Sequence, residues 1–205
     1  VYTKCMENLI EKKKEEKRKN LLQASYRLFT TRGISKVSIA DICKEAGIAK
    51  GTFYLYFSSK EEIARALNKD LSHTVLQRAY ACVVEDRKPA FKENLLTMSN
   101  FLLDYCSNDT DTLLLMSKDF ILPFTIEDFQ KSSDPLFVDL HNEIENYAKK
   151  TGISFEEILF RLYALLSMII SVCYSFYFDH YPSNVDLDTL RKYLNALVSQ
   201  AFTEA

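Results

Sequence analysis

The sequence predicts an all-α protein, on three observations. Gly and Pro number only four each among 205 residues, whereas an all-β fold needs many turns built from them. Apolar residues recur along most of the chain at the i, i+3, i+4, i+7 spacing of one buried helix face. Two segments, Ser59–Glu62 and Ser154–Glu157, fit the Ser-x-x-Glu capping box that begins a helix. We therefore expect about nine helices and no strand.

The first three helices are expected within the first sixty residues. The first covers 15–31 and ends before Gly33, a residue suited to a left-handed cap. The second begins at Ser38, which is a good N-cap, and stops at Gly47. The third covers 50–57.

Six more helices are expected after residue 58. The capping box at Ser59 begins a fourth helix that should continue past Tyr80. The box at Ser154 begins a helix that should end near Phe178. The other four are expected over about 89–106, 111–120, 134–150 and 186–202.

Charge is distributed unevenly along the chain. Residues 1–60 contain 13 Lys and Arg against 6 Asp and Glu, a net charge of +7, whereas residues 61–205 contain 13 against 22, a net charge of −9. A basic segment joined to an acidic one suggests that only the first meets a polyanion. We expect two domains, 1–62 and 63–205, connected by the helix from about residue 59.

The cysteines indicate a reducing compartment. They are five, an odd number, and are spread along the chain without a CxxC pair, as Cys5, Cys43, Cys82, Cys106 and Cys173. Free buried thiols are usual in the cytoplasm, and the chain opens with a charged stretch rather than an apolar signal segment. We expect a cytoplasmic protein with no metal site and no cofactor.

Residues 38–57, SIADICKEAGIAKGTFYLYF, have the pattern of a helix-turn-helix. This motif needs a small residue where two short helices meet, a residue that tolerates positive φ in the turn, and polar groups on the outer face of the second helix. Cys43 is the small residue and Gly47 stands at the bend. The shared core would be formed by Ile39, Ile42, Ile48 and Phe53.

The same stretch resembles the DNA-binding domain of the TetR family of bacterial transcription regulators, over about residues 15–65. The resemblance combines Leu28-Phe29 and Arg32-Gly33, the turn glycine, the Gly-Thr-Phe-Tyr core at 51–54, and the run from Tyr54 through Ser59-Lys60-Glu61-Glu62. It implies an N-terminal three-helix domain that binds DNA, followed by a larger helical domain for ligand binding and dimerisation. Beyond residue 65 the resemblance is one of length and helical character.

The resemblance also implies which residues meet DNA. Positions that meet base edges are occupied by Lys50, Gly51 and Tyr54. Positions that contact phosphates are occupied by Ser38, Thr52, Tyr56 and Lys60. The chemistry of these residues agrees, because hydroxyl and ammonium groups donate to phosphate oxygens and a lysine can donate to guanine. Ala49 departs from the pattern, since many members carry a serine there, and one cap or phosphate contact is lost with that hydroxyl.

The expected helix 155–178 is apolar nearly all round and must be covered on every side. Seventeen uncharged residues lie between Arg161 and Asp179, but serines and tyrosines dilute their apolar character, so we do not expect a membrane span. Only one helix follows, which is too little chain to cover it. A twofold partner contributing the same last two helices would bury the remaining face, and the family resemblance implies this homodimer too.

Aromatic and sulfur-containing side chains concentrate in the middle helices. At helical spacing each of them can be plain core, but as a group they suggest a pocket for a small apolar or aromatic molecule with few charges. The candidate ligand-binding residues are Met98, Phe101, Tyr105, Met116, Phe120, Phe124, Tyr163 and Tyr174.

These patterns predict a ligand-responsive transcription regulator, a repressor that binds a palindromic double-stranded DNA operator as a dimer and is released by an apolar or aromatic effector. An enzyme is not expected, because the three histidines, His73, His141 and His180, occur without HExxH, GxSxG or a Gly-rich phosphate loop. The alternative is an architectural or partner-recruited DNA-binding factor without a small-molecule ligand. Release from DNA by a small molecule would distinguish the two.

Overall fold

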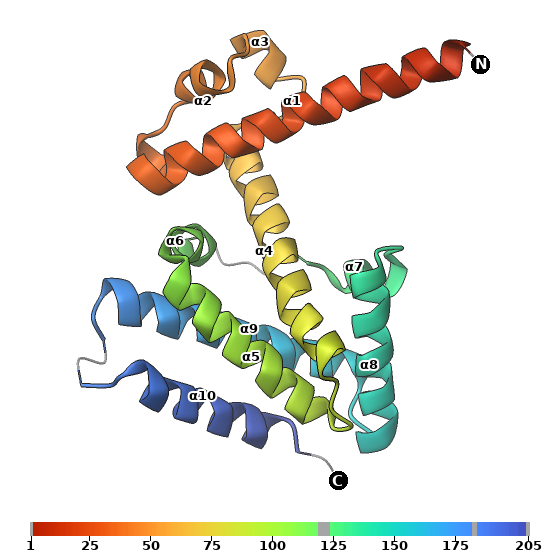
Figure 1. Cartoon of the computed structure of the whole chain (residues 1–205), viewed down its shortest axis with the longest axis vertical. Coiled ribbons are helices and arrows are strands. Elements are labelled where there is room, and N and C mark those ends of the chain that lie inside the picture. Colours follow the sequence, from red (N-terminus) through yellow and green to blue (C-terminus); the bar gives the residue numbers. More distant parts are fainter. Residues whose placement is uncertain (1, 119–123, 182–183, 204–205) are drawn as a thin grey trace. The chain divides into compact units, whose positions relative to one another are not determined.

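The structure is a computed structural model that describes residues 2–118, 124–181 and 184–203 (Figure 1). Within these ranges the chain forms ten α-helices and one short 3-10 helix, with no strand. The all-α prediction is therefore confirmed. The chain divides into two compact units, Val1–Asp70 and Leu71–Ala205, and helix α4 contributes residues to both.

The first unit holds the shorter helices and the start of α4. Its elements are α1 (Tyr2–Arg32), η1 (Ile34–Lys36), α2 (Ile39–Ala46), α3 (Lys50–Phe53) and the beginning of α4 (Lys60–Glu85). The described core of this unit includes fully buried side chains from each α-helix, namely Leu21, Phe29, Ile42, Phe53 and Ile63.

Two boundaries in the first unit differ from the prediction. Helix α1 begins at Tyr2 rather than near residue 15, because the charged run at 11–19 contains no Gly or Pro and charged side chains can extend a solvated helix. Helix α3 ends at Phe53 rather than at residue 57. The N–H of Tyr56 and that of Phe57 both donate to the Phe53 carbonyl, at 2.9 and 3.0 Å, in a turn that buries Phe57.

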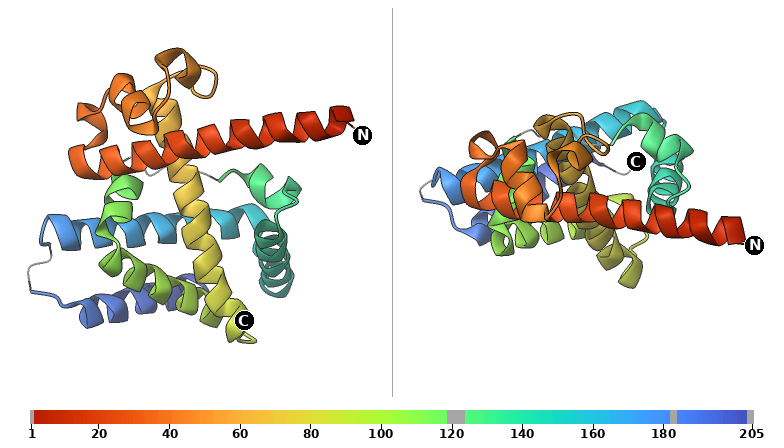
Figure 2. Two further views of the ribbon diagram at one scale, coloured as in Figure 1. Left: turned by 45° about the horizontal axis from the view of Figure 1, so that its top comes forward. Right: turned by 90° about the horizontal axis from the view of Figure 1, so that it is seen from above.

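The second unit is a bundle in which α5 lies beside α9 and α10 (Figures 1 and 2). Its helices after α4 are α5 (Phe91–Asn108), α6 (Thr110–Lys118), α7 (Ile126–Lys131), α8 (Pro135–Thr151), α9 (Phe155–Phe178) and α10 (Leu187–Ala201). Fully buried side chains from these helices form one core, among them Leu103, Leu113, Ile144, Ile158 and Val198.

Helix α7 was not predicted from the sequence. It begins at a capping box in which Thr125 accepts from the N–H of Asp128 at 3.3 Å and the Asp128 carboxylate accepts from the N–H of Thr125 at 2.6 Å. The Thr-x-x-Asp signal was present in the sequence, but a helix of six residues carries too little apolar periodicity to be recognised.

The capping box predicted at Ser59 is formed differently from expectation. The Ser59 hydroxyl accepts from the N–H of Glu62 at 3.2 Å, as predicted. The Glu62 carboxylate, however, accepts from the N–H and the hydroxyl of Ser58, at 2.6 and 2.5 Å. These two bonds hold the pKa of Glu62 below its ordinary value. One carboxylate therefore fixes Ser58, the second residue before α4, through two hydrogen bonds.

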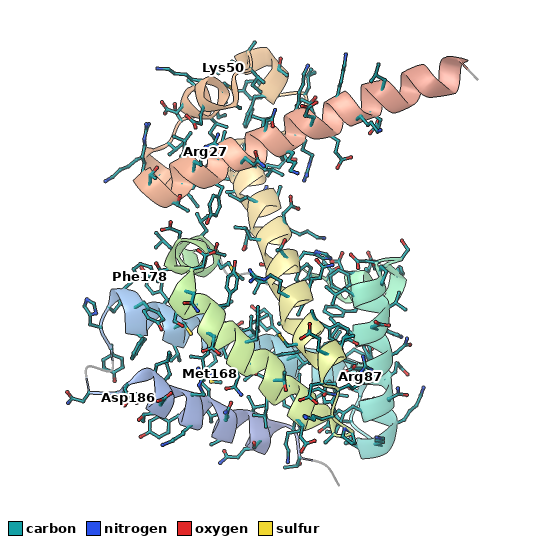
Figure 3. All side chains as sticks on the ribbon, in the orientation of Figure 1. Arg27, Lys50, Arg87, Met168, Phe178 and Asp186 are labelled. Carbon is teal, nitrogen blue, oxygen red and sulfur yellow. The ribbon has the colours of Figure 1, made fainter. Side chains whose placement is uncertain are left out.

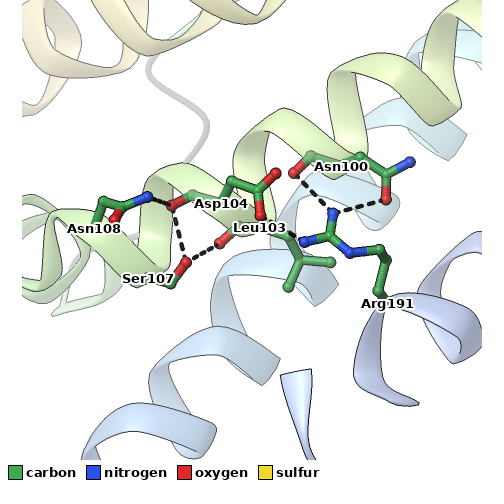
Figure 4. Close-up of polar contacts among 6 residues, drawn as sticks. All are labelled: Asn100, Leu103, Asp104, Ser107, Asn108 and Arg191. Carbon is green, nitrogen blue, oxygen red and sulfur yellow. Dashed lines mark hydrogen bonds and ion pairs between the residues drawn. The ribbon is translucent and has the colours of Figure 1, made fainter. Parts of the chain in front are cut away.

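A polar cluster joins α10 to α5 (Figure 4). The guanidinium of Arg191 donates to the side-chain oxygen of Asn100 at 3.2 Å and to the carboxylate of Asp104 at 2.5 Å. One turn further along α5, Ser107 and Asn108 donate back to the Asp104 carbonyl. Arg191 thus fixes the register of the last helix against α5.

Candidate functional site

The helix-turn-helix of the first unit is assembled by local chemistry. Helix α2 begins at Ser38, whose hydroxyl oxygen accepts from the N–H of Asp41 at 3.2 Å, while the Asp41 carboxylate accepts from the N–H of Ser38 at 2.9 Å. The hydroxyl and N–H of Ser38 lower the pKa of Asp41. Gly47 ends α2 in the left-handed region, with φ 67° and ψ 33°. The chain then enters α3 at Lys50.

The residues expected to meet base edges are exposed on α3 and the turn after it. Lys50, Gly51 and Tyr54 are all exposed, and half of the Tyr54 surface is open. Figure 3 places Lys50 on the side of α2 and α3 away from α1. A Cβ built on Gly51 would meet nothing within 4 Å, so the backbone there is accessible. Phe53 packs edge-on against Tyr54, with ring centroids 5.5 Å apart, and holds that ring at the surface.

An open hollow of about 490 Å³ lies between the starts of α2 and α4. Its wall includes two residues expected to contact phosphates, Ser38 and Lys60. Lys36, Ser58 and Ser59 also line it and were not singled out from the sequence. Free N–H groups at helix starts attract anions, and here two helix starts share one hollow with two lysines and the carboxylate of Glu61. Ser58 could have been recognised from the sequence as a residue of this site, because it lies just before a capped helix start.

Lys60 is held by the backbone of the first unit. Its Nζ donates to the carbonyl oxygens of Ile34 at 2.8 Å and Val37 at 3.0 Å. An ammonium has three N–H donors, and two of them are used in these bonds. The other predicted phosphate contacts, Thr52 and Tyr56, are half-buried on the same unit.

Helix α2, the first helix of the motif, is also tied to α1. The Nε of Arg27 donates to the carboxylate of Glu45 at 3.0 Å. Both side chains of this ion pair are partly exposed to solvent. Arg18 lies over the ring of Phe57, 5.8 Å from its centroid. These contacts join α1 to α2 and to the turn after α3, so the exposed residues of α3 are presented by a connected set of helices.

A second candidate site is an apolar cavity of about 440 Å³ inside the second unit. Helices α4 to α9 all contribute to its wall. Four of the eight residues singled out from the sequence lie there together, namely Met98, Met116, Phe124 and Tyr163. Wall residues that the sequence reasoning missed include Leu76, Leu95, Phe129, Leu140 and Leu166. Most of these residues are leucines, and leucines are so common in helix cores that their positions in a sequence do not indicate a pocket.

Three of the other candidates lie elsewhere. Phe101 and Tyr105 pack beneath the guanidinium of Arg78, which is 5.8 and 5.2 Å from their ring centroids. Tyr174 packs against Phe178, with centroids 4.9 Å apart. The fourth, Phe120, lies outside the described residues.

A polar network stands at one side of this cavity. Glu143 of α8 lines the cavity and accepts from the hydroxyl of Tyr80 in α4 at 3.0 Å. Arg87, labelled in Figure 3, contacts the same Glu143 carboxylate at 2.9 Å and donates to the Tyr80 hydroxyl at 2.7 Å. Burial first, and the Glu143 carboxylate second, raise the pKa of Tyr80 to about 12. The network joins the end of α4 to the wall of the cavity.

Helices α9 and α10 keep large apolar side chains on their outer surface. Phe160 on α9 is exposed, and Tyr193 and Leu197 on α10 are 60% and 44% exposed. Helix α9 is also long and apolar enough to cross a membrane, with a mean hydropathy of 1.8 and 28% of its most apolar window buried. A single helix of this kind is weak evidence of a membrane span, because helices that pack in an interface have the same composition. No cluster of His, Cys, Asp or Glu that could hold a metal was found in the described part of the chain.

Comparison with known proteins agrees with the first site. Residues 21–67 match the family model described as bacterial regulatory proteins, tetR family. The regulator YvdT of Bacillus subtilis is 47% identical over 62 residues, 30% of this chain and 32% of the relative. The regulator TtgR of Pseudomonas putida is 35% identical over 72 residues, 35% of this chain and 34% of the relative. The matched segment thus spans about a third of these relatives.

Solved structures extend the similarity to the fold of the whole chain. One similar structure is that of a putative tetR family transcription regulator from Shewanella. It has a TM-score of 0.65 at 18% identity, and the match covers 90% of this chain and 97% of the Shewanella chain. The regulator FadR from Bacillus subtilis, solved in complex with stearoyl-CoA, has a TM-score of 0.58 at 17% identity, covering 89% and 97%. At this identity the likeness concerns the fold alone.

A helix-turn-helix with an exposed second helix, carried on an all-α fold, defines a DNA-binding transcriptional regulator. Within that class, the match at 21–67 and the fold of the structural neighbours place the chain more narrowly. Residues 21–67 form a DNA-binding domain of the TetR family of bacterial regulatory proteins, and the fold of the rest of the chain is similar to that of solved TetR-type regulators.

Proposed function

We propose that this protein is a cytoplasmic repressor that binds a palindromic operator as a homodimer and is released by a small apolar effector. The observation that carries the proposal is the pairing of an exposed recognition helix with an apolar cavity in the second unit. Helix α4 has its first residue, Lys60, in the DNA-binding unit and Tyr80 beside the cavity wall. One continuous helix therefore contributes residues to both proposed sites.

The exposed residues of α3 are proposed to read the operator. Lys50 and Tyr54 would contact base edges, and Gly51 would allow close approach of the backbone. Ser38 and Lys60 would bind phosphate at the hollow between α2 and α4. Thr52 and Tyr56, which do not line this hollow, would contact phosphates beside it. The Ser38 hydroxyl donates to Asp41 at 2.5 Å, so a phosphate contact requires this hydroxyl to rotate toward the DNA.

The homodimer is proposed to form through α9 and α10. Support comes from the apolar side chains that these helices leave uncovered, including Phe160, Tyr193 and Leu197. Leu194, also on α10, is only 2% exposed because it packs in the core of its own chain. The interface is therefore tested at Tyr193 and Leu197, and not at Leu194.

Induction is proposed to act through α4. An effector in the cavity would alter the contacts that Glu143 makes with Tyr80 and Arg87. Movement of the far end of α4 would change the position of Lys60 and so the separation of the two recognition helices in the dimer. Coupling of this kind is typically about 1–3 kcal/mol and reciprocal, so operator DNA should weaken effector binding by the factor by which effector weakens DNA binding.

The experiment that tests the proposal has two steps. Genomic fragments bound by the purified protein are selected and sequenced, which yields the operator. Lipophilic compounds are then titrated against the protein–operator complex in a fluorescence anisotropy assay. Release of DNA by a compound that binds the protein supports the proposal. Tight binding of compounds that leave DNA affinity unchanged would favour an architectural or partner-recruited factor instead.

A further inference from the structure

The charged residues in the wall of the cavity of the second unit are acidic. Its wall is almost entirely apolar, and the charged side chains that the structure describes in it are Glu143 and Glu156. No Lys, Arg or His belongs to the described wall. Asn94, a neutral polar residue of the wall, is hydrogen-bonded to the backbone of Lys88. Its side-chain oxygen accepts from the Lys88 N–H at 2.9 Å, and its side-chain nitrogen donates to the Lys88 carbonyl at 3.2 Å. The wall thus contributes two carboxylates and no cation, and Arg87, which is not a wall residue, offsets the charge of Glu143 at 2.9 Å.

Glu143 is the better placed of the two to meet a ligand. Its side chain is only 15% exposed. Tyr80 and Arg87 both contact the same oxygen, Oε1, at 3.0 and 2.9 Å. Within the described residues no donor contacts Oε2. A largely buried carboxylate that uses half of its accepting capacity gains free energy from a cation or a strong donor.

Glu156 adds a second negative charge at the same cavity. It lies in the first turn of α9, and its side chain is exposed. The described part of the chain offers it no ion pair. Its neighbour Glu157, in contrast, pairs with Arg161 at 2.5 Å. The wall thus holds one partly buried carboxylate and one solvated carboxylate on opposite helices, α8 and α9.

We infer that the effector of this protein is a lipophilic cation, with an apolar body in the cavity and an amine or quaternary ammonium group at Glu143. The inference rests on the proposed ligand-responsive function and specifies its ligand class. A cavity of about 440 Å³ lies within the usual range of about 300–1,000 Å³ for sites of small molecules. A carboxylate or the phosphates of an acyl-CoA, such as the stearoyl-CoA held by the FadR structure, would be placed against Glu143 with no cation in the described wall, because Arg87 lies outside that wall and is already paired with Glu143.

The test compares probes that share one chain length and differ in charge. The three probes of one chain length are dodecyltrimethylammonium and dodecanoate, each below its critical micelle concentration, and dodecanol below its solubility limit. They are titrated into the full chain by isothermal calorimetry, and stearoyl-CoA is added as a longer acidic probe. The ammonium should bind about tenfold more tightly than dodecanol, the factor expected for one charge-assisted contact. Dodecanoate and stearoyl-CoA should bind more weakly than dodecanol. Added salt should reduce the preference for the cation.

Two variants separate the role of Glu143 from general effects. Glu143→Gln should remove the preference for the ammonium over dodecanol, chiefly through weaker binding of the ammonium. Glu145→Gln is the matched control, because Glu145 lies on the same helix, pairs with Lys149 at 3.4 Å and is not part of the described wall. If Glu143→Gln fails to fold, as judged by circular dichroism, Glu156→Gln replaces it and should reduce the same preference.

The outcomes also separate this inference from the proposed function. Tighter binding of dodecanoate or stearoyl-CoA than of the ammonium overturns the ligand class, and release of operator DNA by such an acid would still support a ligand-responsive repressor. Binding of the ammonium without release of DNA supports the ligand class and contradicts the induction mechanism. Failure of all four probes to bind, or an unchanged preference in Glu143→Gln, overturns the inference.

Discussion

The ammonium of Lys60 donates to the carbonyl oxygen of Val37 at 3.0 Å, across 23 residues of sequence. Val37 directly precedes Ser38, the N-cap of α2. Lys60 is itself the first residue of α4. The first residue of α4 therefore fixes the start of the helix that precedes the recognition helix, in addition to placing a positive charge at the proposed phosphate hollow.

Replacing Lys60 with Ala should have two measurable effects. Loss of two hydrogen bonds from a charged group should lower the free energy of unfolding by about 1.5–3 kcal/mol, measured by urea denaturation. If the same ammonium also meets a phosphate, affinity for all DNA sequences should fall alike, and the slope of log affinity against log salt should become shallower by about one unit. A changed sequence preference with an unchanged slope would contradict this role.

Replacing Lys50 or Tyr54 with Ala should instead reduce specificity. Each change should weaken operator binding by about 1–3 kcal/mol, the range for a good base contact, and should affect random DNA less. Fluorescence anisotropy with operator and scrambled duplexes measures the difference. Lys149→Ala, which removes one exposed positive charge from the second unit, is the control for net charge and should leave the specificity ratio unaltered.

Charge at the outer face of α10 should dissociate the dimer. Leu197→Glu and Tyr193→Glu place a carboxylate where a partner is proposed to pack, and burying an unpaired charge is strongly unfavourable. Sedimentation velocity at micromolar concentration should show a dimer for the unaltered chain and a monomer for these variants. Lys192→Glu, at an exposed neighbouring position, should remain dimeric. A monomeric unaltered chain would rule out the proposed interface.

Tyr80 should ionise at a higher pH than a free tyrosine. Its pKa is raised to about 12 by burial and by Glu143, whereas a free tyrosine ionises near pH 10. Because the folded state holds this proton more tightly than the unfolded chain does, the associated stability is complete below pH 10 and is lost as pH rises toward 12. The absorbance titration at 295 nm of the unaltered chain minus that of Tyr80→Phe isolates this group among the 12 tyrosines. A difference curve centred near pH 10 would contradict the assignment.

Local chemistry allowed much of this architecture to be predicted from the sequence. The caps at Ser38 and Ser154 and the left-handed Gly47 depend on residues within four positions of one another, and such contacts are encoded by spacing alone. The helix-turn-helix pattern and the family resemblance likewise depend on residues that are close together in the sequence. The exposed positions of Lys50 and Tyr54 were also expected, because the apolar periodicity assigned the opposite face to the core.

Other features depended on contacts between distant segments. A lysine at a helix start reads as a phosphate contact, and only the folded chain brings the Ile34 carbonyl, 26 residues away, within 2.8 Å of Lys60. Likewise Tyr80 and Glu143, 63 residues apart, meet only when α4 packs near α8. Which aromatic side chains face the cavity also depends on how each helix is rotated in the bundle, so Met98 lines it while Phe101, on the same helix, packs under Arg78. Helical spacing determines which residues share a face, but the packing of neighbouring helices decides what that face meets.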